Sequence, residues 1–483
     1  MTMTIMGDGD LLFSALVLSL LAIALLELPK KKKKKQRLCL PPGPWNLPVV
    51  GSAHRLVNTL AHRTLRDMAY VHGPLMHLRV GQVPVVVVTS KELARDVLKT
   101  HDANFATRSK LVAGGIVAYD WADILFSPSG DYWRKLRRLC IQEILSTKRI
   151  LSFQHIREDE RSNAADFLAA IKQSVVMSSG FYVPDLFPRF TGILSVLTGM
   201  RRKLRAIRRT VDGILEEIIC EREEMLKQAR TDLRPLLQGN NKEEENLVDV
   251  LLGLQENGHD FGFPMTRDTI KAIILDMFAG GTGTSASAME WAMSELMTNP
   301  KVMRKLQAEI RAAFPGKQQI ITETDLRASD LKYLKFVMKE TLRLHPPAPL
   351  LVPRESIEAC EINGYMIPAK ARVIVNSWAI SRDPKYWEDA EEFKPERFQG
   401  AALDFGSNYE YTPFGSGRRM CPGYNYGLAS MELTLAQLLH SFDWSLPDGM
   451  DHVDMSEAPG LGVRRKTPLL LRATPALYAF AAS

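Results

Sequence analysis

Apolar residues along the chain recur mostly at helical spacing, and strict alternation is confined to short stretches. Helices are therefore expected over most of residues 131–228 and 265–345, and again over 424–441. Residues 74–90 alternate instead, which predicts two short strands joined by a Gly-Gln turn. Helices thus dominate the expected fold.

Further local features complete this expectation. A helix over 91–100 is predicted, with Ser90 as its cap. Residues 360–378 alternate around an Asn-Gly pair and predict sheet, and a strand pair is expected near 461–473. A polar stretch, 230–246, reads as an exposed link between helical blocks. The pattern predicts a mainly α protein with a minor β-sheet in one large domain.

The N-terminal part carries a nearly unbroken apolar run over 11–28, followed at once by six lysines, Lys30 to Lys35. A membrane-spanning helix needs roughly 17–25 residues. A cleaved signal peptide carries its positive charge before the apolar stretch, whereas positive charge after it places the following chain in the cytosol. We expect an anchor, with a cleaved or peripheral segment as the alternative. The expected division is tail 1–10, transmembrane anchor 11–28, basic and proline-rich linker 29–51 and globular domain 52–483.

Composition narrows the function classes. The 483 residues are 46% hydrophobic, and much of the net charge of +7 comes from the lysine run. No basic face with interleaved aromatic residues is visible, so nucleic-acid binding is not expected. The five cysteines are far apart and form no CxxC pair, which suggests neither a zinc site nor a disulfide framework.

The sequence "FAGGTGTSA", residues 278–286, interrupts a long apolar run of helical character. Each glycine inside a helix costs about 1 kcal/mol relative to alanine. Either this helix is poorly made, or a group must lie close against its backbone.

The strongest chemical signal is "PFGSGRRMCPG", residues 413–423, directly before the helix over 424–441. A cysteine at a helix N-terminus meets unsatisfied N–H groups, which favour the thiolate. A thiolate is the electron-donating axial ligand with which haem oxygenases favour O–O cleavage. The alternative is a buried structural cysteine beside a turn. These residues leave both interpretations of Cys421 open.

This stretch resembles the cysteine loop of the cytochrome P450 superfamily, F-x-x-G-x-R-x-C-x-G. The resemblance implies that Cys421 ligates the iron of haem b and that Arg419 contacts a haem propionate. The resemblance extends from about Pro41 to the C-terminus. Within the superfamily, the sequence most resembles plant microsomal (A-type) members, especially grass enzymes of specialised metabolism. The residues that fill the loop pattern are Phe414, Gly417, Arg419, Cys421 and Gly423.

Four other motifs of the family occur in the expected order. By resemblance, Trp133, Arg137 and Arg354 would meet the propionates. The E-x-x-R pair would be buried and joined by a later arginine. Without the cysteine loop, each of these residues reads as ordinary core or surface. The motif residues are Trp133 and Arg137, Glu340 and Arg343, Arg354, and Arg397.

The resemblance implies a monooxygenase that inserts one oxygen atom from O2 into a lipophilic small molecule, such as a terpenoid. Electrons would come from NADPH through a membrane partner, NADPH-cytochrome P450 reductase. The chain would be a single-pass protein of the endoplasmic reticulum membrane, with its catalytic domain in the cytosol. Besides the reductase, membrane lipid and the substrate are the expected partners.

By the same resemblance, four stretches line the substrate pocket. They are largely apolar, which suits a lipophilic substrate but equally suits a generic core. The stretches are 110–126, Ala279 with Gly280, 347–352, and the turn near Leu461.

One departure from the family pattern concerns proton delivery. The pattern of the central helix, [A/G]-G-x-[D/E]-T-[T/S], has its alcohol here as Thr284, but Gly283 holds the acid position. General acid–base groups typically contribute 10²–10⁴-fold to a rate. We expect slow or uncoupled monooxygenation. The alternative is a member that does not activate O2 and instead rearranges or dehydrates its substrate.

A second departure is a shortened segment. After residue 160 the sequence lacks the end of one helix, the whole of the next and their connection, with the join near Arg161–Asn163. The loss would uncover apolar surface and favour aggregation. A mis-spliced or wrongly predicted gene product would explain it, and the chain would then bind haem but be catalytically impaired.

Overall fold

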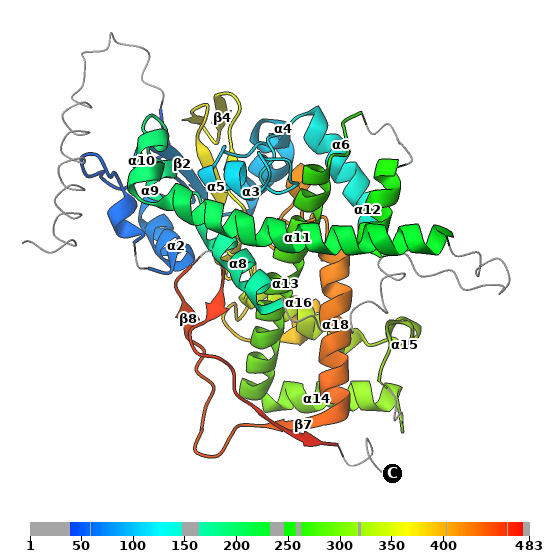
Figure 1. Ribbon diagram of the computed structural model, residues 1–483. Coiled ribbons are helices and arrows are strands. Elements are labelled where there is room, and N and C mark those ends of the chain that lie inside the picture. The colour runs from blue at the N-terminus through cyan, green and yellow to red at the C-terminus, as the bar shows by residue number, and fades with distance from the viewer. Residues whose placement is uncertain are drawn as a thin grey trace, which may run out of the picture.

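The computed structural model describes residues 39–57, 59–146, 164–231, 246–256, 262–316, 320–401, 403–460 and 462–476. Within them the protein is mainly helical with small sheets (Figure 1). The predicted anchor over 11–28 and the join at Arg161–Asn163 lie outside the described residues. None of the described helices is long and apolar enough to cross a membrane.

Helices account for most of the described chain and begin and end close to the predicted bounds. The helix expected over 424–441 is observed with those bounds, and Ser90 caps α3 by accepting a hydrogen bond from the Leu93 amide. The helices are α2 (Ala61–His72), α3 (Lys91–Arg95), α4 (Asp102–Phe105), α5 (Val112–Ile116), α6 (Asp131–Leu139), α8 (Ala164–Met177), α9 (Val183–Leu186), α10 (Thr191–Leu197), α11 (Met200–Thr231), α12 (Leu247–Glu256), α13 (Arg267–Thr298), α14 (Pro300–Ala313), α15 (Glu323–Ala328), α16 (Lys332–Leu344), α17 (Ser377–Ile380) and α18 (Tyr424–Ser441).

Shorter helical turns join these elements. The helix expected over 91–100 continues past α3 as a wider π-helix. The turns are η1 (Ala53–Arg55), η6 (Pro395–Phe398) and η7 (Gly417–Arg419), which are 3₁₀-helical, and η2 (Asp96–Thr100) and η3 (Cys140–Ile144), which are π-helical.

The largest sheet has the strand order β1-β2-β6-β3. Its β1–β2 hairpin turns at Gly81 and Gln82, as the sequence predicts, and β2 pairs with β6 in parallel. A second predicted hairpin, β4–β5, turns at Asn363 and Gly364, both with positive φ. The strands are β1 (Leu75–Val80), β2 (Val83–Val88), β3 (Arg354–Glu355), β4 (Cys360–Ile362), β5 (Tyr365–Ile367), β6 (Arg372–Val375), β7 (Phe442–Ser445), β8 (Glu457–Ala458), β9 (Arg464–Arg465) and β10 (Arg472–Pro475).

One strand prediction is wrong in its pairing. Strands β9 and β10 lie in the stretch 461–473 and just beyond it, but they do not pair with each other. Instead, β9 pairs with β8, and β10 pairs with β7. Local alternation predicts that a strand exists, but the partner depends on chain segments that lie farther away.

The helix α13 runs through the middle of the molecule beside α18, with α11 crossing over it (Figure 1). It stays helical from Arg267 to Thr298, so the glycine-rich stretch does not end it. Its two ends are buried in different apolar clusters: Ile270–Leu275 pack with α8 and α11, whereas Ala288–Leu296 pack with α14, α16 and α18. Between these ends, Phe278, Gly280 and residues 282–284 are exposed. The glycine-rich centre of α13 is therefore accessible, whereas both ends of the helix are packed.

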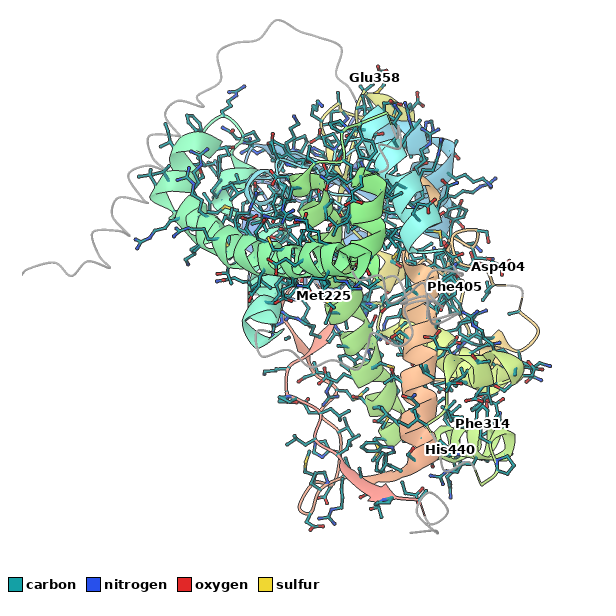
Figure 2. The ribbon with its side chains drawn as sticks, turned by 45° about the vertical axis from the view of Figure 1, so that its right-hand side comes forward. Met225, Phe314, Glu358, Asp404, Phe405 and His440 are labelled. Atoms are coloured by element: carbon teal, nitrogen blue, oxygen red, sulfur yellow. The ribbon has the colours of Figure 1, made fainter. Side chains whose placement is uncertain are left out.

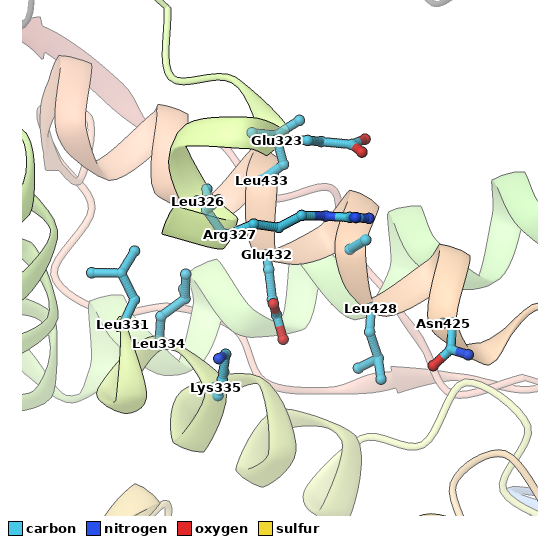
Figure 3. A pocket seen from close by; sticks show the side chains of 11 residues that line it. Glu323, Leu326, Arg327, Leu331, Leu334, Lys335, Asn425, Leu428, Glu432 and Leu433 are labelled. Carbon is cyan, nitrogen blue, oxygen red and sulfur yellow. The ribbon is translucent and has the colours of Figure 1, made fainter. Parts of the chain in front are cut away.

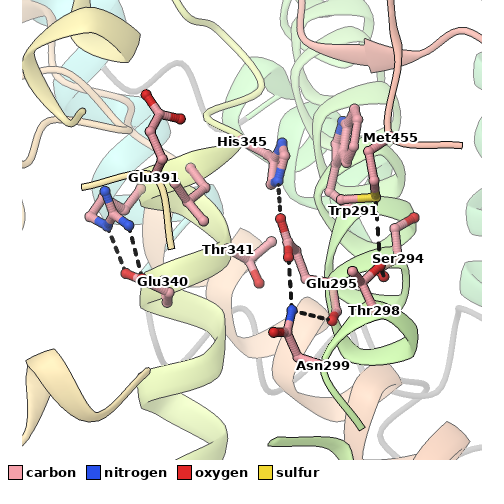
Figure 4. A network of polar contacts seen from close by, with 12 residues as sticks. Trp291, Ser294, Glu295, Thr298, Asn299, Glu340, Thr341, His345, Glu391 and Met455 are labelled. Carbon is pink, nitrogen blue, oxygen red and sulfur yellow. Dashed lines mark hydrogen bonds and ion pairs between the residues drawn. The ribbon is translucent and has the colours of Figure 1, made fainter. Parts of the chain in front are cut away.

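The E-x-x-R pair on α16 is buried and structural. Glu340 and Arg343 are 0% exposed, and the Arg343 guanidinium donates to Glu340 at 2.7 and 2.9 Å (Figure 4). Arg397 in η6 donates to the same carboxylate at 2.9 Å. Arg343 also donates to the carbonyls of Ser381 and Ala390. This network joins α16 to the segment that leads into the cysteine loop.

Candidate active site

The cysteine loop closes on itself just before α18. The amide of Cys421 donates to the Phe414 carbonyl at 2.9 Å. Gly417 has φ +70°, and a Cβ there would lie 2.1 Å from the Leu98 carbonyl oxygen. Phe405, which is labelled in Figure 2, packs edge-on against Phe414 with ring centres 5.1 Å apart. Only glycine fits at position 417, which explains its place in the loop pattern.

The environment of Cys421 does not by itself favour the thiolate. Burial raises the pKa of this thiol, and the Gly423 amide and the charge of Arg137 lower it to a smaller extent. The Gly423 amide thus favours the thiolate as expected, but burial outweighs its effect. A bound metal ion deprotonates a coordinating thiol outright. Among the described residues, no three His, Cys, Asp or Glu side chains gather to hold a metal ion.

Three arginines from separate elements converge beside this loop. Arg137 on α6 donates to the Met420 carbonyl at 2.5 Å, and Arg354 on β3 donates to the Ser416 carbonyl and pairs with Asp102 at 2.7 Å. Burial and the positive charges of the other two arginines lower the pKa of Arg419 to about 9. Three like charges next to a cysteine, of which Arg354 is buried and Arg137 and Arg419 are partly buried, suit an anionic ligand, as the carboxylates of haem b would be.

Trp133 contacts the arginine group through Arg419. Its indole Nε1 donates to the Ile124 carbonyl at 3.1 Å, and the Arg419 guanidinium lies 3.8 Å from the centre of its ring. Arg419 in turn donates to the carbonyls of Ala106, Ile124 and Ser127. Trp133 therefore positions Arg419 by stacking.

The exposed centre of α13 carries the other residues that the sequence predicts for the site, Gly280, Gly283 and Thr284. No atom of the described residues lies within 4 Å of where a Cβ would stand at Gly280, Gly281 or Gly283. The Thr284 hydroxyl donates to the Gly280 carbonyl one turn back at 2.6 Å. The interrupted pattern thus leaves room for a flat group against the helix backbone, and the residues present fit haem b.

Several residues of the site escaped the sequence analysis. Asp102 pairs with Arg354, and Arg108 donates to Leu125, Val352 and Pro353. Asp276 on α13 accepts from the Ile124 amide at 2.6 Å. Asp276 is a charged residue inside the apolar run that precedes "FAGGTGTSA", and this unusual position could have identified it. Nothing in the local sequence distinguishes Asp102.

A pocket and a polar network lie outside the cysteine loop and the arginine group. A pocket of about 300 Å³ between α15, α16 and α18 contains Glu432, with Lys335 beside it (Figure 3). A polar network joins α13 to the end of α16, where His345 stacks on Trp291 and its Nε2 lies 2.7 Å from Glu295 (Figure 4). The pocket is lined by no residue of the cysteine loop, and the polar network holds α13 against the end of α16.

Comparison with known proteins identifies this architecture. A sequence model of the family described as Cytochrome P450 matches residues 41–191 and 151–472. These two matches overlap over 151–191, the stretch in which the sequence predicts missing residues. The fold is similar to that of a zebra fish cytochrome P450 solved with progesterone, with a TM-score of 0.65 at 22% identity, covering 87% of this chain and 100% of that chain.

Curated relatives share much more of the sequence. Premnaspirodiene oxygenase of Hyoscyamus muticus is 47% identical, covering 96% of this chain and 98% of that protein. For 5-epiaristolochene 1,3-dihydroxylase of Nicotiana tabacum the identity is 45%, with the same two coverages. Tabersonine 3-oxygenase of Catharanthus roseus is 44% identical, covering 94% and 96%. These relatives are plant proteins, and they leave the narrower likeness to grass enzymes untested.

Proposed function

Because the chain belongs to the cytochrome P450 family, we propose that it hydroxylates a lipophilic small molecule, a terpenoid or another plant specialised metabolite. The observation that carries the proposal is the cysteine loop, in which the partly buried Cys421 lies beside Arg137 and directly before α18. The names of the relatives, which include oxygenases and a dihydroxylase, support the reaction and the substrate class.

Each residue of the site has a role in this proposal. Cys421 would hold the iron, and Phe414, with Gly423, would shape the loop around the sulfur. Arg137, Arg354 and Arg419 would bind the carboxylates of the cofactor, with Trp133 holding Arg419 in place. When bound, haem b supplies the iron at which O2 is activated, with electrons that come from NADPH through NADPH-cytochrome P450 reductase.

Proton handling falls to Thr284 in this proposal. Its hydroxyl donates to the Gly280 carbonyl, and its oxygen can still accept a hydrogen bond from a water molecule in the site. Gly283 offers no carboxyl to resupply the proton. We therefore expect part of the reducing equivalents to be lost without product.

The proposal includes a membrane location, with residues 11–28 as a single-pass anchor in the endoplasmic reticulum. One side of the described structure supports it. Exposed apolar side chains lie on α10, on α2 and near the start of the described chain. In Figure 1, α10 and α2 lie on the same side of the molecule, and both border one apolar cluster. Such a patch suits a lipid surface. The exposed residues are Trp45, Val57, Val71, Ile193, Val196 and Leu197.

A second candidate function is a haem-binding but catalytically impaired protein. The alignment with premnaspirodiene oxygenase runs over 506 residues, more than the 483 of this chain. That relative therefore contains residues without a counterpart here, which supports a shortened segment after residue 160. Together with Gly283, this supports impaired chemistry. A third candidate, an isomerase or dehydratase that does not activate O2, is supported by Gly283 alone.

One experiment separates these candidates. The full chain is reconstituted with the reductase in lipid and given a panel of terpenoids under ¹⁸O2. The proposed function predicts a substrate-dependent product that carries one ¹⁸O atom. NADPH consumption without product would favour the impaired protein, and a product without ¹⁸O or NADPH use would favour the isomerase or dehydratase.

A further inference from the structure

The chain between α5 and α6, residues 117–130 (the α5–α6 segment), contains a short stretch whose backbone carbonyls bind an arginine. This stretch, residues 124–127, is a turn and the residue after it, and we call it the carbonyl turn. The Arg419 guanidinium donates to the Ile124 carbonyl at 3.1 Å and to the Ser127 carbonyl at 2.6 Å. The backbone of the carbonyl turn thus helps to determine where an arginine beside the cysteine loop lies.

These contacts fix Arg419 but do not use all of its donors. Its Nε also donates to the Ala106 carbonyl at 2.7 Å. A guanidinium has five N–H groups in a rigid planar fork, and the described carbonyls take three of them, one on each nitrogen. One N–H on each terminal nitrogen is left for a carboxylate, which binds arginine well through two parallel hydrogen bonds. The direction of these two donors follows from the three that are fixed.

Ile124 is held on both sides of its backbone. Its carbonyl accepts from Arg419 and also from the indole Nε1 of Trp133, at 3.1 Å in each case. Its amide donates to Oδ2 of Asp276 at 2.6 Å, and Asp276 belongs to the central helix α13. Asp276 therefore binds the same residue whose carbonyl receives the guanidinium.

The backbone that leads into the carbonyl turn does not favour its own shape. Tyr119, Asp120 and Trp121 are consecutive residues with φ of +50°, +57° and +57°. This left-handed region is disfavoured for residues that carry a side chain. Such a conformation persists only where the surrounding structure imposes it. The position of the turn therefore depends on contacts from other elements, and Asp276 makes one of them from α13.

We propose that Asp276 is a positioning residue for the cofactor: it holds the Ile124 backbone, and thereby keeps Arg419 in the orientation that binds a carboxylate of haem b. Asp276 acts through hydrogen bonds and needs no contact with the cofactor itself. This inference rests on the proposed function, in which Arg419 binds that carboxylate. It adds that α13 contributes to haem binding through an acid that precedes its glycine-rich centre.

The alternative is a role confined to the substrate pocket. The α5–α6 segment overlaps the stretch 110–126, which the resemblance to the family places in the pocket wall. Loss of Asp276 would then change the affinity for substrate and leave the contacts of the haem carboxylates as they are. The two roles therefore differ in what happens to the haem when no substrate is present.

The test compares Asp276→Ala and Asp276→Asn with the native protein, each as the full haem-loaded chain without substrate. Two quantities are measured: the rate of haem transfer to haem-free myoglobin, and the propionate bending band in the resonance Raman spectrum. Asp276→Ala should release haem about tenfold faster, the effect expected for one lost hydrogen bond, and should shift the band. Asp276→Asn should stay close to the native protein, because its amide oxygen can still accept from the Ile124 amide.

Asp268→Ala is the matched control, because Asp268 is an exposed acid at the start of the same helix, and it should change neither measurement. A native rate and an unshifted band in Asp276→Ala would overturn the proposal. It would also be overturned if Asp276→Asn released haem as fast as Asp276→Ala. A native chain that binds no haem would instead contradict the proposed function.

A double-mutant cycle separates positioning of Arg419 from a general loss of stability. Arg419→Met removes the N–H donors, so Asp276→Ala should add little to the rate of haem transfer in this background. Arg354→Met is the comparison, because the hydrogen bonds of Arg354 go to Asp102 and Ser416, and there the two effects should multiply. Effects that multiply in both backgrounds would mean that Asp276 does not act through Arg419.

Discussion

Gly283 is the residue at which this chain differs most in chemistry from the pattern of its family. It lies on the exposed centre of α13, next to Thr284, with open space where a side chain would stand. An acid at this position needs no rearrangement of the helix, because no described atom would meet its Cβ. The missing carboxyl can therefore be restored without disturbing the fold.

Gly283→Glu should raise the yield of product per NADPH consumed. Restoring a general acid typically contributes 10²–10⁴-fold to a proton-transfer step, although the gain in yield is limited by other steps. Gly283→Gln, which fills the same space without an acid, is the control and should leave the yield near that of the native chain. Identical yields for the native protein and Gly283→Glu would show that Gly283 does not lower the yield of product per NADPH.

Gly417→Ala should disrupt the cysteine loop. A Cβ would meet the Leu98 carbonyl oxygen at 2.1 Å in a backbone with φ +70°, so the loop must move. The expected result is loss of most bound haem after purification, measured as haem per protein. Gly427→Ala on α18, where nothing lies within 4 Å, is the control and should bind haem normally. Full haem content in Gly417→Ala would refute this account of the loop.

The sequence could predict much of this site but not all of it. Cys421, Arg419 and the glycines lie in one contiguous loop, so their pattern is visible locally. Asp276 and Ile124 are 152 residues apart, and their contact depends on the packing of α13 against the α5–α6 segment. The burial that raises the pKa of Cys421 was not predictable for the same reason, because it depends on neighbouring elements.

At the scale of elements, helices were predicted better than strand pairs. The spacing of apolar residues determines which face of α18 is buried, and the extent of this pattern predicts where the helix begins and ends. The partner of β10 is β7, a strand some thirty residues away in the sequence, so alternation within 461–473 could not reveal it. Small sheets of two-residue strands depend on tertiary contacts more than on their own sequence.

Glu340→Gln on α16 should lower the free energy of unfolding by about 3–5 kcal/mol, because two buried arginines would lose their shared carboxylate. Denaturant unfolding of the haem-loaded protein measures this change. The control on the same helix is Lys332→Gln, which removes an exposed ion pair to Asp330 and should leave stability unchanged. A stable Glu340→Gln protein would mean that the network contributes little.

Glu432→Gln on α18 should stabilise the protein at pH 8 but not at pH 4. Burial raises the pKa of Glu432, while Lys335 and Lys339 lower it to a smaller extent. The carboxyl is neutral in both states at pH 4, and its ionisation is penalised only in the folded state as pH rises. A melting temperature about 2 °C higher at pH 8 is expected.

The exposed Glu217→Gln on α11 serves as the control for this comparison and should not change the melting temperature at either pH. If Glu432→Gln raises the melting temperature equally at pH 4 and pH 8, ionisation of Glu432 does not destabilise the folded protein.

At the scale of the whole molecule, the two ends of α13 are buried in separate helical clusters, and the glycine-rich centre between them is exposed. The cysteine loop, the arginine group and the exposed glycines come from different elements. A cofactor bound there would contact all of them, so it is expected to contribute to the stability of the fold as well as to chemistry. Protein prepared without haem should therefore melt at a lower temperature than the haem-loaded chain.

The most direct measurement is the CO-difference spectrum of the dithionite-reduced protein, prepared from the full chain and from Cys421→His. The account predicts a Soret band at the position of thiolate-ligated haem in the native chain, and its loss or displacement in the variant. A native protein that binds no haem, or whose band lies where thiolate ligation is absent, would contradict the central claim that Cys421 holds the iron.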